Sequence, residues 1–402
     1  MARRRLALLP AALLLAACAQ TPEPAAPETT TEATSPEAAT TPATTPTPVP
    51  ANPDATAADG RPFEVREVTS LTEPWAMEFL PDGRALVTLK GGTLLVLDPQ
   101  SGDTTEVANA PEVSASGQGG MHDIALGPTF DDDGTIYLSW VESTGGRESR
   151  GVVGKGRLAL DGEPALENLE IIWGQEPTSG NGHYALRLAV SPDGQHLFVS
   201  SGDRQKLDPA QDIQSRLGKI MRLTLQGYHV GDNPFVDEHG VAAEVWSYGH
   251  RNPLGLDVDP QGNLWSSEMG PRGGDELNLI KPGVNYGWPE VSEGDHYDGR
   301  SIPDHAGSSF EPPVESWVPA ISPGNLMIYD GETFPQWQGD AFLGGLSGQT
   351  LVRVDLDGAQ GSEAERWDMG ERIREVEQSP DGTIYLLEDG RGGRVLQLVP
   401  PQ

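Results

Sequence analysis

The chain has 402 residues, with 60 acidic and 27 basic side chains and a formal net charge of −33. This charge excludes nucleic acid and anionic lipid surfaces as main partners, because their phosphates would be repelled. The 49 glycines and 35 prolines, together with short apolar runs and 36% hydrophobic residues, predict an all-β domain with many turns.

The first residues have the composition of an export signal. Arg3, Arg4 and Arg5 precede an apolar run, Leu6 to Ala17, that is too short to span a bilayer as a helix. The sequence Leu-Ala-Ala before Cys18 resembles a bacterial lipobox. We therefore expect residues 1–17 to be a lipoprotein signal peptide and the sulfur of Cys18 to carry lipid. A plain secretory signal is the alternative, although the only cysteine of the chain would be an odd residue at that place.

The segment that follows cannot bury a core. Residues 18–58 are rich in Thr, Pro, Ala and Glu and show no apolar periodicity, which predicts a disordered tether behind the lipidated cysteine. Its lipid would be the only attachment to a membrane. The expected location is the periplasmic side of an outer membrane or the cell surface.

Residues 59–402 contain a repeated turn and strand. A Gly that follows Asp or Gln, at positions 83, 134, 194, 262 and 382, ends a tight turn and precedes a short apolar strand, and Asp330-Gly331 is a weaker member. The steps between the turns are roughly 50 to 70 residues, which is typical of propeller blades. Six instances predict a six-bladed β-propeller. A single β-sandwich, the alternative, would not extend over a domain of this length.

The stretch 244–290 is the most informative part of this domain. It predicts two short strands joined by a Pro-Gln-Gly-Asn turn, with polar loops on both sides. One loop contains His250, Arg251 and Asn252, and the other contains Gly270, Pro271 and the pair Asp275-Glu276. Glycines beside charged side chains are typical of places where backbone approaches a ligand closely. The alternative is that these are ordinary hairpin loops whose polar residues bind no ligand.

Other polar loops occur at corresponding points of the repeat. Gln118 lies in a glycine-rich loop, and His183 follows Gly-Asn-Gly; an imidazole can accept a proton near neutral pH. Arg372 and Arg374 are two residues apart, so on a strand both side chains face one way and predict a carboxylate or phosphate clamp. A solvated edge paired with neighbouring glutamates is the alternative. His122 and His250 are further candidates that the sequence does not rank.

The sequence lacks the motifs of several cofactor classes. It has no thiol pair, no His-x-x-x-His spacing, no P-loop and no dinucleotide fingerprint after a strand, so zinc, ATP and NAD sites are unsupported. Acidic, oxygen-rich loops suit calcium.

These loops resemble those of the PQQ-dependent soluble aldose and glucose dehydrogenases, the quinoprotein sugar dehydrogenase family. The resemblance extends from about Val65 to Leu398. It is most specific in residues 249–253, in Gly270-Pro271 with Asp275-Glu276, and in residues 285–289. It implies a six-bladed propeller, in agreement with the repeat.

The resemblance also implies roles for individual residues. PQQ would be bound by Gln118, Arg251, Asn252, Gly270, Pro271, Arg372 and Arg374. Calcium beside PQQ would be held by the carbonyl groups of Gly270 and Pro271, and a second calcium by Glu276 and Tyr286. His183 would remove the proton of the sugar's anomeric hydroxyl, with hydride transfer to PQQ, and Arg251 would stabilise negative charge on the quinone oxygen. The product would be a lactone, and a separate acceptor, a cytochrome or a quinone, would receive the electrons.

Two positions depart from the family pattern. Ser347 stands where the family usually has a lysine, which removes one positive contact to PQQ. Ala185 and Leu186 replace glycines after His183, and we expect them to narrow the approach to the histidine.

Two other functions remain open from the sequence alone. The first is a cofactor-free propeller that binds sugars, which Ser347 would favour. The second is a calcium-dependent lactonase, in which Arg372 and Arg374 would have no evident role.

Overall fold

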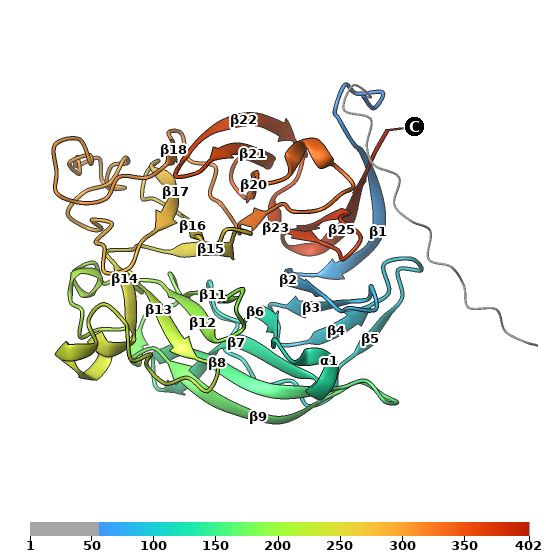
Figure 1. The fold of residues 1–402 in the computed structure, drawn as a ribbon, viewed down its shortest axis with the longest axis horizontal. Helices are drawn as coiled ribbons and strands as arrows, with labels where there is room; N and C mark the ends of the chain where they lie inside the picture. The colour runs from blue at the N-terminus through green and yellow to red at the C-terminus, as the bar shows by residue number, and fades with distance from the viewer. Residues whose placement is uncertain (1–55, 402) are drawn as a thin grey trace, which may run out of the picture. The chain divides into compact units, whose positions relative to one another are not determined.

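Six antiparallel sheets make up residues 56–401, the part of the chain that the computed structural model describes (Figure 1). We call these sheets blades 1 to 6, in the order in which their innermost strands occur in the chain. The expected signal peptide, Cys18 and almost all of the tether lie outside the described residues. Among the described residues, no helix has the length and apolar character that crossing a membrane requires.

The first three blades come from the N-terminal half of the domain. Blade 1 contains β2 (Pro74–Phe79), β3 (Ala85–Leu89), β4 (Leu94–Leu97) and β5 (Thr104–Glu106). Blade 2 contains β6 (Met121–Leu126), β7 (Thr135–Gly145), β8 (Glu148–Ala159), β9 (Ala165–Gly174) and the short β10 (Thr178–Ser179). Blade 3 contains β11 (Ala185–Val190), β12 (His196–Ser201), β13 (Lys219–Thr224) and β14 (Val245–Tyr248).

The other three blades follow the same pattern. Blade 4 contains β15 (Pro253–Val258), β16 (Leu264–Glu268), β17 (Asp275–Ile280) and β18 (Glu315–Trp317). Blade 5 contains β19 (Met327–Ile328), β20 (Ala341–Gly345), β21 (Thr350–Asp357) and β22 (Gln360–Asp368). Blade 6 contains β23 (Ile373–Gln378), β24 (Ile384–Glu388), β25 (Arg391–Val399) and β1 (Glu64–Thr72).

Helical segments are few and short in the described part of the chain. They are α1 (Phe130–Asp133) and the 3₁₀ turns η1 (Asp208–Gln211), η2 (Val236–Glu238), η3 (Gly240–Glu244) and η4 (Pro335–Trp337). These turns lie in the connections between strands. The six antiparallel sheets, together with this small helical content, confirm the predicted six-bladed β-propeller.

The two ends of the domain meet in blade 6. Strand β1 pairs antiparallel with β25, from Glu64 opposite Val399 to Thr72 opposite Arg391, so that the N-terminal strand is the outermost strand of the blade formed by the C-terminal residues (Figure 1). Backbone hydrogen bonds within blade 6 thus join the two ends of the domain and close the ring of blades.

The repeated glycines do what the sequence predicts. Gly83 and Gly382 have φ of +87° and +79°, and each donates its backbone N–H to a carbonyl three residues earlier, in the turn between the first two strands of a blade. Only glycine adopts such a φ without strain. Each turn sends the second strand back toward the face at which the first strand began.

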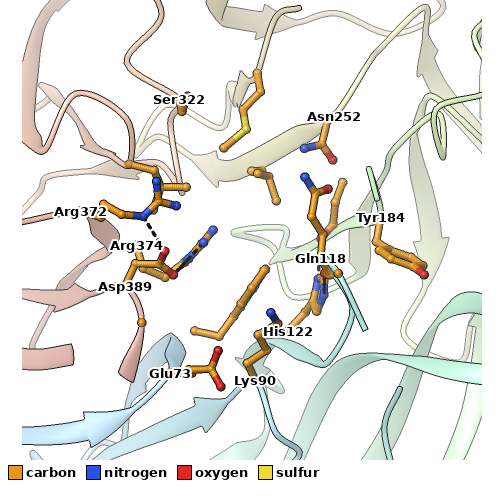
Figure 2. A pocket seen from close by; sticks show the side chains of 17 residues that line it. Glu73, Lys90, Gln118, His122, Tyr184, Asn252, Ser322, Arg372, Arg374 and Asp389 are labelled. Carbon is orange, nitrogen blue, oxygen red and sulfur yellow. Dashed lines mark hydrogen bonds and ion pairs between the residues drawn. The ribbon is translucent and has the colours of Figure 1, made fainter. Parts of the chain in front are cut away.

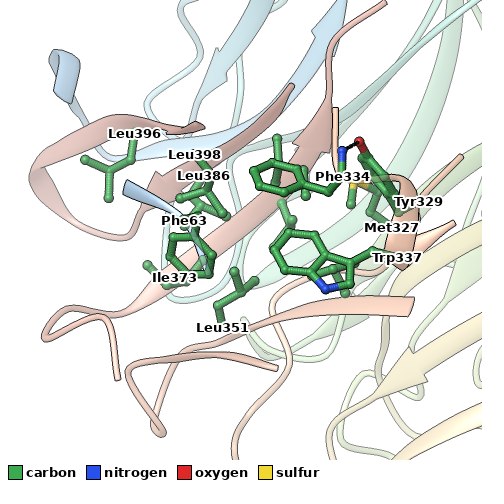
Figure 3. Close-up of a cluster of buried hydrophobic side chains, with 13 residues drawn as sticks. Phe63, Met327, Tyr329, Phe334, Trp337, Leu351, Ile373, Leu386, Leu396 and Leu398 are labelled. Atoms are coloured by element: carbon green, nitrogen blue, oxygen red, sulfur yellow. Dashed lines mark hydrogen bonds between the residues drawn. The ribbon is translucent and has the colours of Figure 1, made fainter. Parts of the chain in front are cut away.

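Apolar side chains between adjacent blades form the core. Between blades 5 and 6, the ring of Phe334 stacks on Trp337 at 4.4 Å, and Phe63 meets Trp337 edge-on at 6.3 Å (Figure 3). Phe63 immediately precedes β1, so burying its ring fixes the closing strand in place. A buried aromatic side chain of this kind contributes about 2–3 kcal/mol.

The first strands of the blades surround a central channel. Each of β2, β6, β11, β15, β19 and β23 lies beside the first strands of the two neighbouring blades. The starts of five of these strands, together with Ser322 before β19, line one cavity, and residues farther along the channel line a second cavity of about 260 Å³. The six strands therefore run in the same direction along the channel.

Arg187, on β11, lies across the channel between the two cavities. Its guanidinium donates to Asp123 and to both carboxylate oxygens of Glu375, at 2.6–3.1 Å, and to the carbonyl oxygens of Leu254 and Gly324. These acceptors come from four other blades. The side chain thus fixes the channel wall directly beneath the first cavity.

Candidate active site

A cavity of about 350 Å³ lies at the face of the propeller where the first strands begin (Figure 2). Its size falls within the range typical of small-molecule sites. Charged and polar side chains from all six blades or the loops before them contribute to the lining: Glu73, Lys90, Gln118, His122, Tyr184, Asn252, Ser322, Arg372, Arg374 and Asp389.

A histidine and an aspartate form a hydrogen-bonded pair beside this cavity, next to Tyr184 and Ala185 of its lining. His183 Nδ1 lies 2.7 Å from Asp203 Oδ1, and the other carboxylate oxygen accepts a hydrogen bond of 2.9 Å from the indole of Trp288. Since the carboxylate only accepts, Nδ1 carries the proton and Nε2 keeps its lone pair. Burial lowers the pKa of His183, against the opposing effect of Asp203, so the imidazole is neutral at neutral pH and can act as a base.

The loop that carries His183 has an unusual backbone. His183, Ala185 and Leu186 have φ of 50°, 57° and 72°, and the β11–β12 ladder shifts register between Ala185 and Leu188. The buried guanidinium of Arg204 supports this backbone by donating to the carbonyl groups of Gly182 and Gly180. The strained conformation is therefore held by contacts outside the loop itself.

This bulge corrects one expectation. Leu186 does not narrow the approach to His183, because its side chain is fully buried in the core between blades 2 and 3. Only Ala185 lines the cavity. The shifted register turns the leucine inward, so of the two departures after the histidine only the alanine adds a side chain near the site.

The two arginines converge as the sequence predicts. Arg372 Nε donates to one oxygen of Asp389 at 2.8 Å, and Arg374 donates to the other at 2.9 and 3.1 Å. The Arg374 guanidinium also lies over the ring of Trp75, 4.2 Å from its centroid. Burial alone would raise the pKa of Asp389, but the charges of the two arginines keep it lowered. One carboxylate thus orients two cations whose remaining N–H groups face the cavity (Figure 2).

The alternative pairing of these arginines with neighbouring glutamates is wrong for Glu375. The β23–β24 ladder shifts register between Ile373 and Glu375, and the glutamate binds Arg187 in the channel instead. Arg374 is consequently left for Asp389 and the cavity.

The Arg251–Asn252 pair shows unused hydrogen-bonding capacity. Neither amide atom of Asn252 has a hydrogen-bond partner among the described residues, although the side chain is buried and lines the cavity. The Nε of Arg251 is also buried without a partner, while its Nη1 donates to the carbonyl of Met269 at 2.9 Å. Leaving such groups unpaired costs about 1–3 kcal/mol each, which a bound ligand would recover.

The Gly270-Pro271 backbone is held in an open arrangement. Asp275 accepts the N–H of Gly270 at 2.9 Å and the N–H of Ser322 at 2.6 Å, so its carboxylate braces the loop. No hydrogen bond from the described residues reaches the carbonyl oxygen of Gly270 or Pro271. Free carbonyl oxygens are suitable ligands for calcium.

Glu276 and Tyr286 meet at a separate small cavity of about 10 Å³, which Glu268 also lines. Burial, followed by the nearby charge of Glu268, raises the pKa of Glu276 well above its ordinary value. The Tyr286 hydroxyl is engaged elsewhere, donating to the carbonyl of Leu279. Across residues 56–401, no three His, Cys, Asp or Glu side chains gather as a metal-binding group, so a calcium ion would also need backbone oxygens.

The structure distinguishes His122 and His250, which the sequence could not rank, from His183. His250 is fully buried, lies 2.9 Å from Glu268 and stacks on Tyr286 at 4.8 Å, away from the first cavity. His122 lines the cavity but both ring nitrogens face carbonyl oxygens of the chain, and burial lowers its pKa to about 4. Neither offers a free nitrogen as His183 does.

Sequence reasoning missed Asp203, Lys90 and Asp389. Each follows the second strand of its blade: β12, β3 and β24 respectively. Because second strands run antiparallel to first strands, their ends lie at the face where the first strands begin. Polar residues after the second strand of each repeat were therefore the available signal.

Comparisons with known proteins agree with this arrangement. A family model described as glucose / sorbosone dehydrogenase matches residues 71–397. An aldose sugar dehydrogenase of Escherichia coli (strain K12) is 38% identical over 338 residues, which cover 82% of this chain and 91% of the relative. Quinoprotein glucose dehydrogenase B of Acinetobacter calcoaceticus is 26% identical, with 81% and 85% covered.

Solved structures show the same likeness. The apo-form of the soluble E. coli aldose sugar dehydrogenase has a TM-score of 0.80 at 37% identity, over 84% of this chain and 99% of that one. The PQQ-bound aldose sugar dehydrogenase of Streptomyces coelicolor has a TM-score of 0.70 at 31% identity, over 84% and 98%. Fold and site are those of an oxidoreductase that acts on the CH–OH groups of sugars. The chain belongs to the glucose / sorbosone dehydrogenase family.

Proposed function

We propose that this protein oxidises aldose sugars at the anomeric carbon to lactones, with PQQ as cofactor and calcium as its metal. The observation that carries the proposal is the place of the His183–Asp203 pair directly beside the cavity that Arg372 and Arg374 line: Tyr184 and Ala185, the residues after the histidine, belong to that lining. A relative named aldose sugar dehydrogenase and a similar structure described as PQQ-bound support the same substrate and cofactor.

The residues of the cavity fit PQQ, a planar quinone with three carboxylates. Arg372 and Arg374 present N–H groups to carboxylates, and the unpartnered amide of Asn252 offers a donor to a quinone oxygen. When bound, PQQ accepts the two electrons of the sugar's C–H bond. Gln118 connects the lining of the cavity to the base, because its side-chain oxygen accepts the backbone N–H of His183 at 2.6 Å.

His183 removes the proton of the anomeric hydroxyl. Its Nε2 receives that proton because Nδ1 is already bonded to Asp203, and the resulting imidazolium is stabilised by the carboxylate. Loss of the hydroxyl proton raises the electron density on the anomeric carbon and favours departure of its hydride. Trp288 keeps Asp203 in place through the second oxygen.

Arg251 would stabilise negative charge on the quinone oxygen, since it lies between Asn252, which lines the first cavity, and the Met269 carbonyl. Its guanidinium is fixed by the carbonyl of Met269 and lies 5.3 Å from the centre of the Trp288 ring, close to the partner of the base. Preorganised donors of this kind lower a barrier because they need not reorient during the reaction.

Calcium would bind at two places. The carbonyl oxygens of Gly270 and Pro271 accept no hydrogen bond from the described residues, and Asp275 braces their loop, of which Met269 lines the first cavity. The small cavity at Glu276 and Tyr286 holds two buried carboxylate side chains whose repulsion a divalent cation would remove.

Export and anchoring are part of the proposal and rest on residues 1–18 alone. A lipid on Cys18 would keep the propeller at a membrane surface on the periplasmic side or at the cell surface, within reach of a separate electron acceptor. Labelling cells with a radioactive fatty acid tests this, since the wild-type chain should be labelled and Cys18→Ser should not.

The activity is tested with purified protein supplied with PQQ and calcium. We expect aldose-dependent reduction of an electron-accepting dye, none in chelator, and a higher PQQ concentration for half-maximal activity in Arg374→Met. A protein that binds sugar without binding micromolar PQQ would be the cofactor-free propeller, and lactone hydrolysis without PQQ would indicate the lactonase. Either result would contradict the proposal.

A further inference from the structure

We infer that Lys90, on blade 1, supplies a positive contact to a cofactor carboxylate in a cavity whose blade 5 side, at Ser347, carries no charge. This inference rests on the proposed function, because it concerns the same cavity and the same anionic cofactor. Lys90 was not singled out from the sequence, and it lies on a different blade from Ser347.

Lys90 belongs to the lining of the cavity. It directly follows β3, and Figure 2 shows its side chain and that of Glu73 on one side of the cavity, across from Asn252 and Ser322. The cavity therefore has cations on two sides, with Lys90 on blade 1 and the arginine pair on blade 6.

The backbone of Lys90 is fixed between two blades. Its N–H donates to the carbonyl of Glu73 at 2.9 Å, before β2, and its carbonyl accepts the N–H of Met121 at 3.2 Å, at the start of β6. A side chain at Gly120 would collide with the carbonyl and the Cγ of Lys90, so the glycine before β6 is needed for this arrangement. The lysine thus extends from an anchored position at the cavity.

The ammonium group has no partner within the described part of the chain. No hydrogen bond or ion pair to Lys90 Nζ is found there, and the Glu73 carboxylate lies beyond the 4.0 Å of an ion pair. The arginines differ, because Asp389 binds both of them. An uncommitted cation beside a cavity lined by arginines favours an anionic ligand with more than one carboxylate.

The blade 5 position carries no such charge. The Ser347 hydroxyl lies 2.8 Å from that of Ser322 and 3.3 Å from the carbonyl of Ala320, so its hydrogen bonds are made within the protein. Ser322 lines the cavity, so this side of it presents hydroxyl groups. A positive charge therefore has to come from another part of the lining, and Lys90 provides one on the side opposite Ser322, where it would meet a different part of the ligand.

The test is PQQ affinity, measured by calorimetry with calcium present, for the wild type, Lys90→Met and Lys90→Arg. Loss of one charge-assisted contact should raise the Kd about tenfold to a hundredfold in Lys90→Met, and the arginine variant should restore most of the affinity. The affinity of Lys90→Met should also fall less steeply with salt, because one screened charge contact is absent. Lys155→Met, which removes the same charge on β8 away from the cavity, is the matched control and should leave the Kd unchanged.

Three results would overturn the inference. Equal affinity of Lys90→Met and wild type, with equal salt dependence, would show that Lys90 makes no contact while leaving the proposed function intact. A change in the KM for sugar with unchanged PQQ affinity would assign Lys90 to substrate instead. Absence of PQQ binding by the wild type would overturn the proposed function and this inference together. Equal melting temperatures of the variants exclude a folding defect.

Discussion

His183 and Asp203 lie 2.7 Å apart, Nδ1 to Oδ1, although they come from opposite ends of the β11–β12 hairpin of blade 3. The hairpin brings the residue before its first strand next to the residue after its second strand. The pair therefore lies at the face of the propeller where the cavity opens, with the proton on Nδ1 and the lone pair on Nε2.

Asp203→Asn tests the role of that pair. The amide can donate to Nδ1, which favours the tautomer with the proton on Nε2 and removes the base. We expect kcat for aldose oxidation to fall about a hundredfold to ten-thousandfold. PQQ affinity should stay within about threefold of wild type, because Asp203 does not line the cavity. Unchanged kcat would show that His183 is not the base.

The pH dependence of kcat follows from the lowered pKa of His183. The base must be neutral, so activity is lost as the pH falls through this pKa; because burial lowers the pKa, the acid limb should lie below the ordinary histidine value of about 6.5. A pH–rate profile measures the limb. Activity that is already half lost above pH 7 would contradict a buried, neutral histidine.

Arg374→Met should weaken PQQ binding more than Arg372→Met. Arg374 is buried between Trp75 and Asp389, whereas the Arg372 side chain is 46% exposed and its contacts are screened by water. We expect about a hundredfold loss of affinity for Arg374→Met and about tenfold for Arg372→Met, by calorimetric titration. Equal losses would show that burial does not set the strength of these contacts.

Arg187→Met should destabilise the propeller without changing the lining of the first cavity, to which Arg187 does not belong. It leaves the carboxylates of Asp123 and Glu375 buried without their cation, which costs about 3–5 kcal/mol of unfolding free energy. Urea denaturation measures the change. Arg157→Met is the control, because its pair with Glu167 is about half exposed and should change stability by less than about 1 kcal/mol. Similar effects of the two substitutions would contradict the role given to Arg187.

The Glu78 carboxylate, which lines the second channel cavity, leads us to expect that the free energy of unfolding falls as the pH rises. Burial, followed by the charges of Asp123, Asp257 and Glu375, raises the pKa of Glu78 to about 8. The folded chain therefore keeps a proton on Glu78 that the unfolded chain releases near pH 4.5. This proton stabilises the folded chain fully at low pH, and the stabilisation is lost as the pH rises toward 8. In urea denaturation between pH 5 and 8, Glu78→Gln should flatten this decline.

The matched control for that series is Glu106→Gln on β5, at an exposed position. It removes the same charge without entering the channel, so its pH profile should follow that of wild type. A Glu78→Gln profile as steep as the control would mean that Glu78 is ionised in the folded chain.

Much of the fold could be predicted from the sequence because the repeat is local. Turn glycines such as Gly83 and Gly382, followed by apolar strands, occur with positive φ in five of the six blades and need no long-range information; Gly331 of blade 5, the weaker member, does not adopt a positive φ. The closing pair of β1 with β25 could not be predicted in this way, because it joins opposite ends of the domain.

The site was predictable where chemistry lies in a short motif. His183, Asn252 and the pair Arg372–Arg374 could be singled out by their residue types and spacing. Asp203 and Lys90 could not, because their importance depends on which strand ends share a face. Leu186 was misplaced because a bulge with positive φ reverses the direction that regular alternation predicts.

The central claim is that the protein removes hydride from the anomeric carbon of an aldose while His183 accepts the hydroxyl proton. The most direct measurement is anaerobic rapid mixing of the PQQ-loaded protein with glucose, following the absorbance of the bound oxidised cofactor. We predict an absorbance loss that is slower with glucose deuterated at C1, is nearly abolished in His183→Ala, and does not occur with 1,5-anhydroglucitol, which lacks the anomeric hydroxyl. Other aldoses are screened in the same way. An absorbance that no aldose changes, or that changes at the same rate in His183→Ala, would contradict the account.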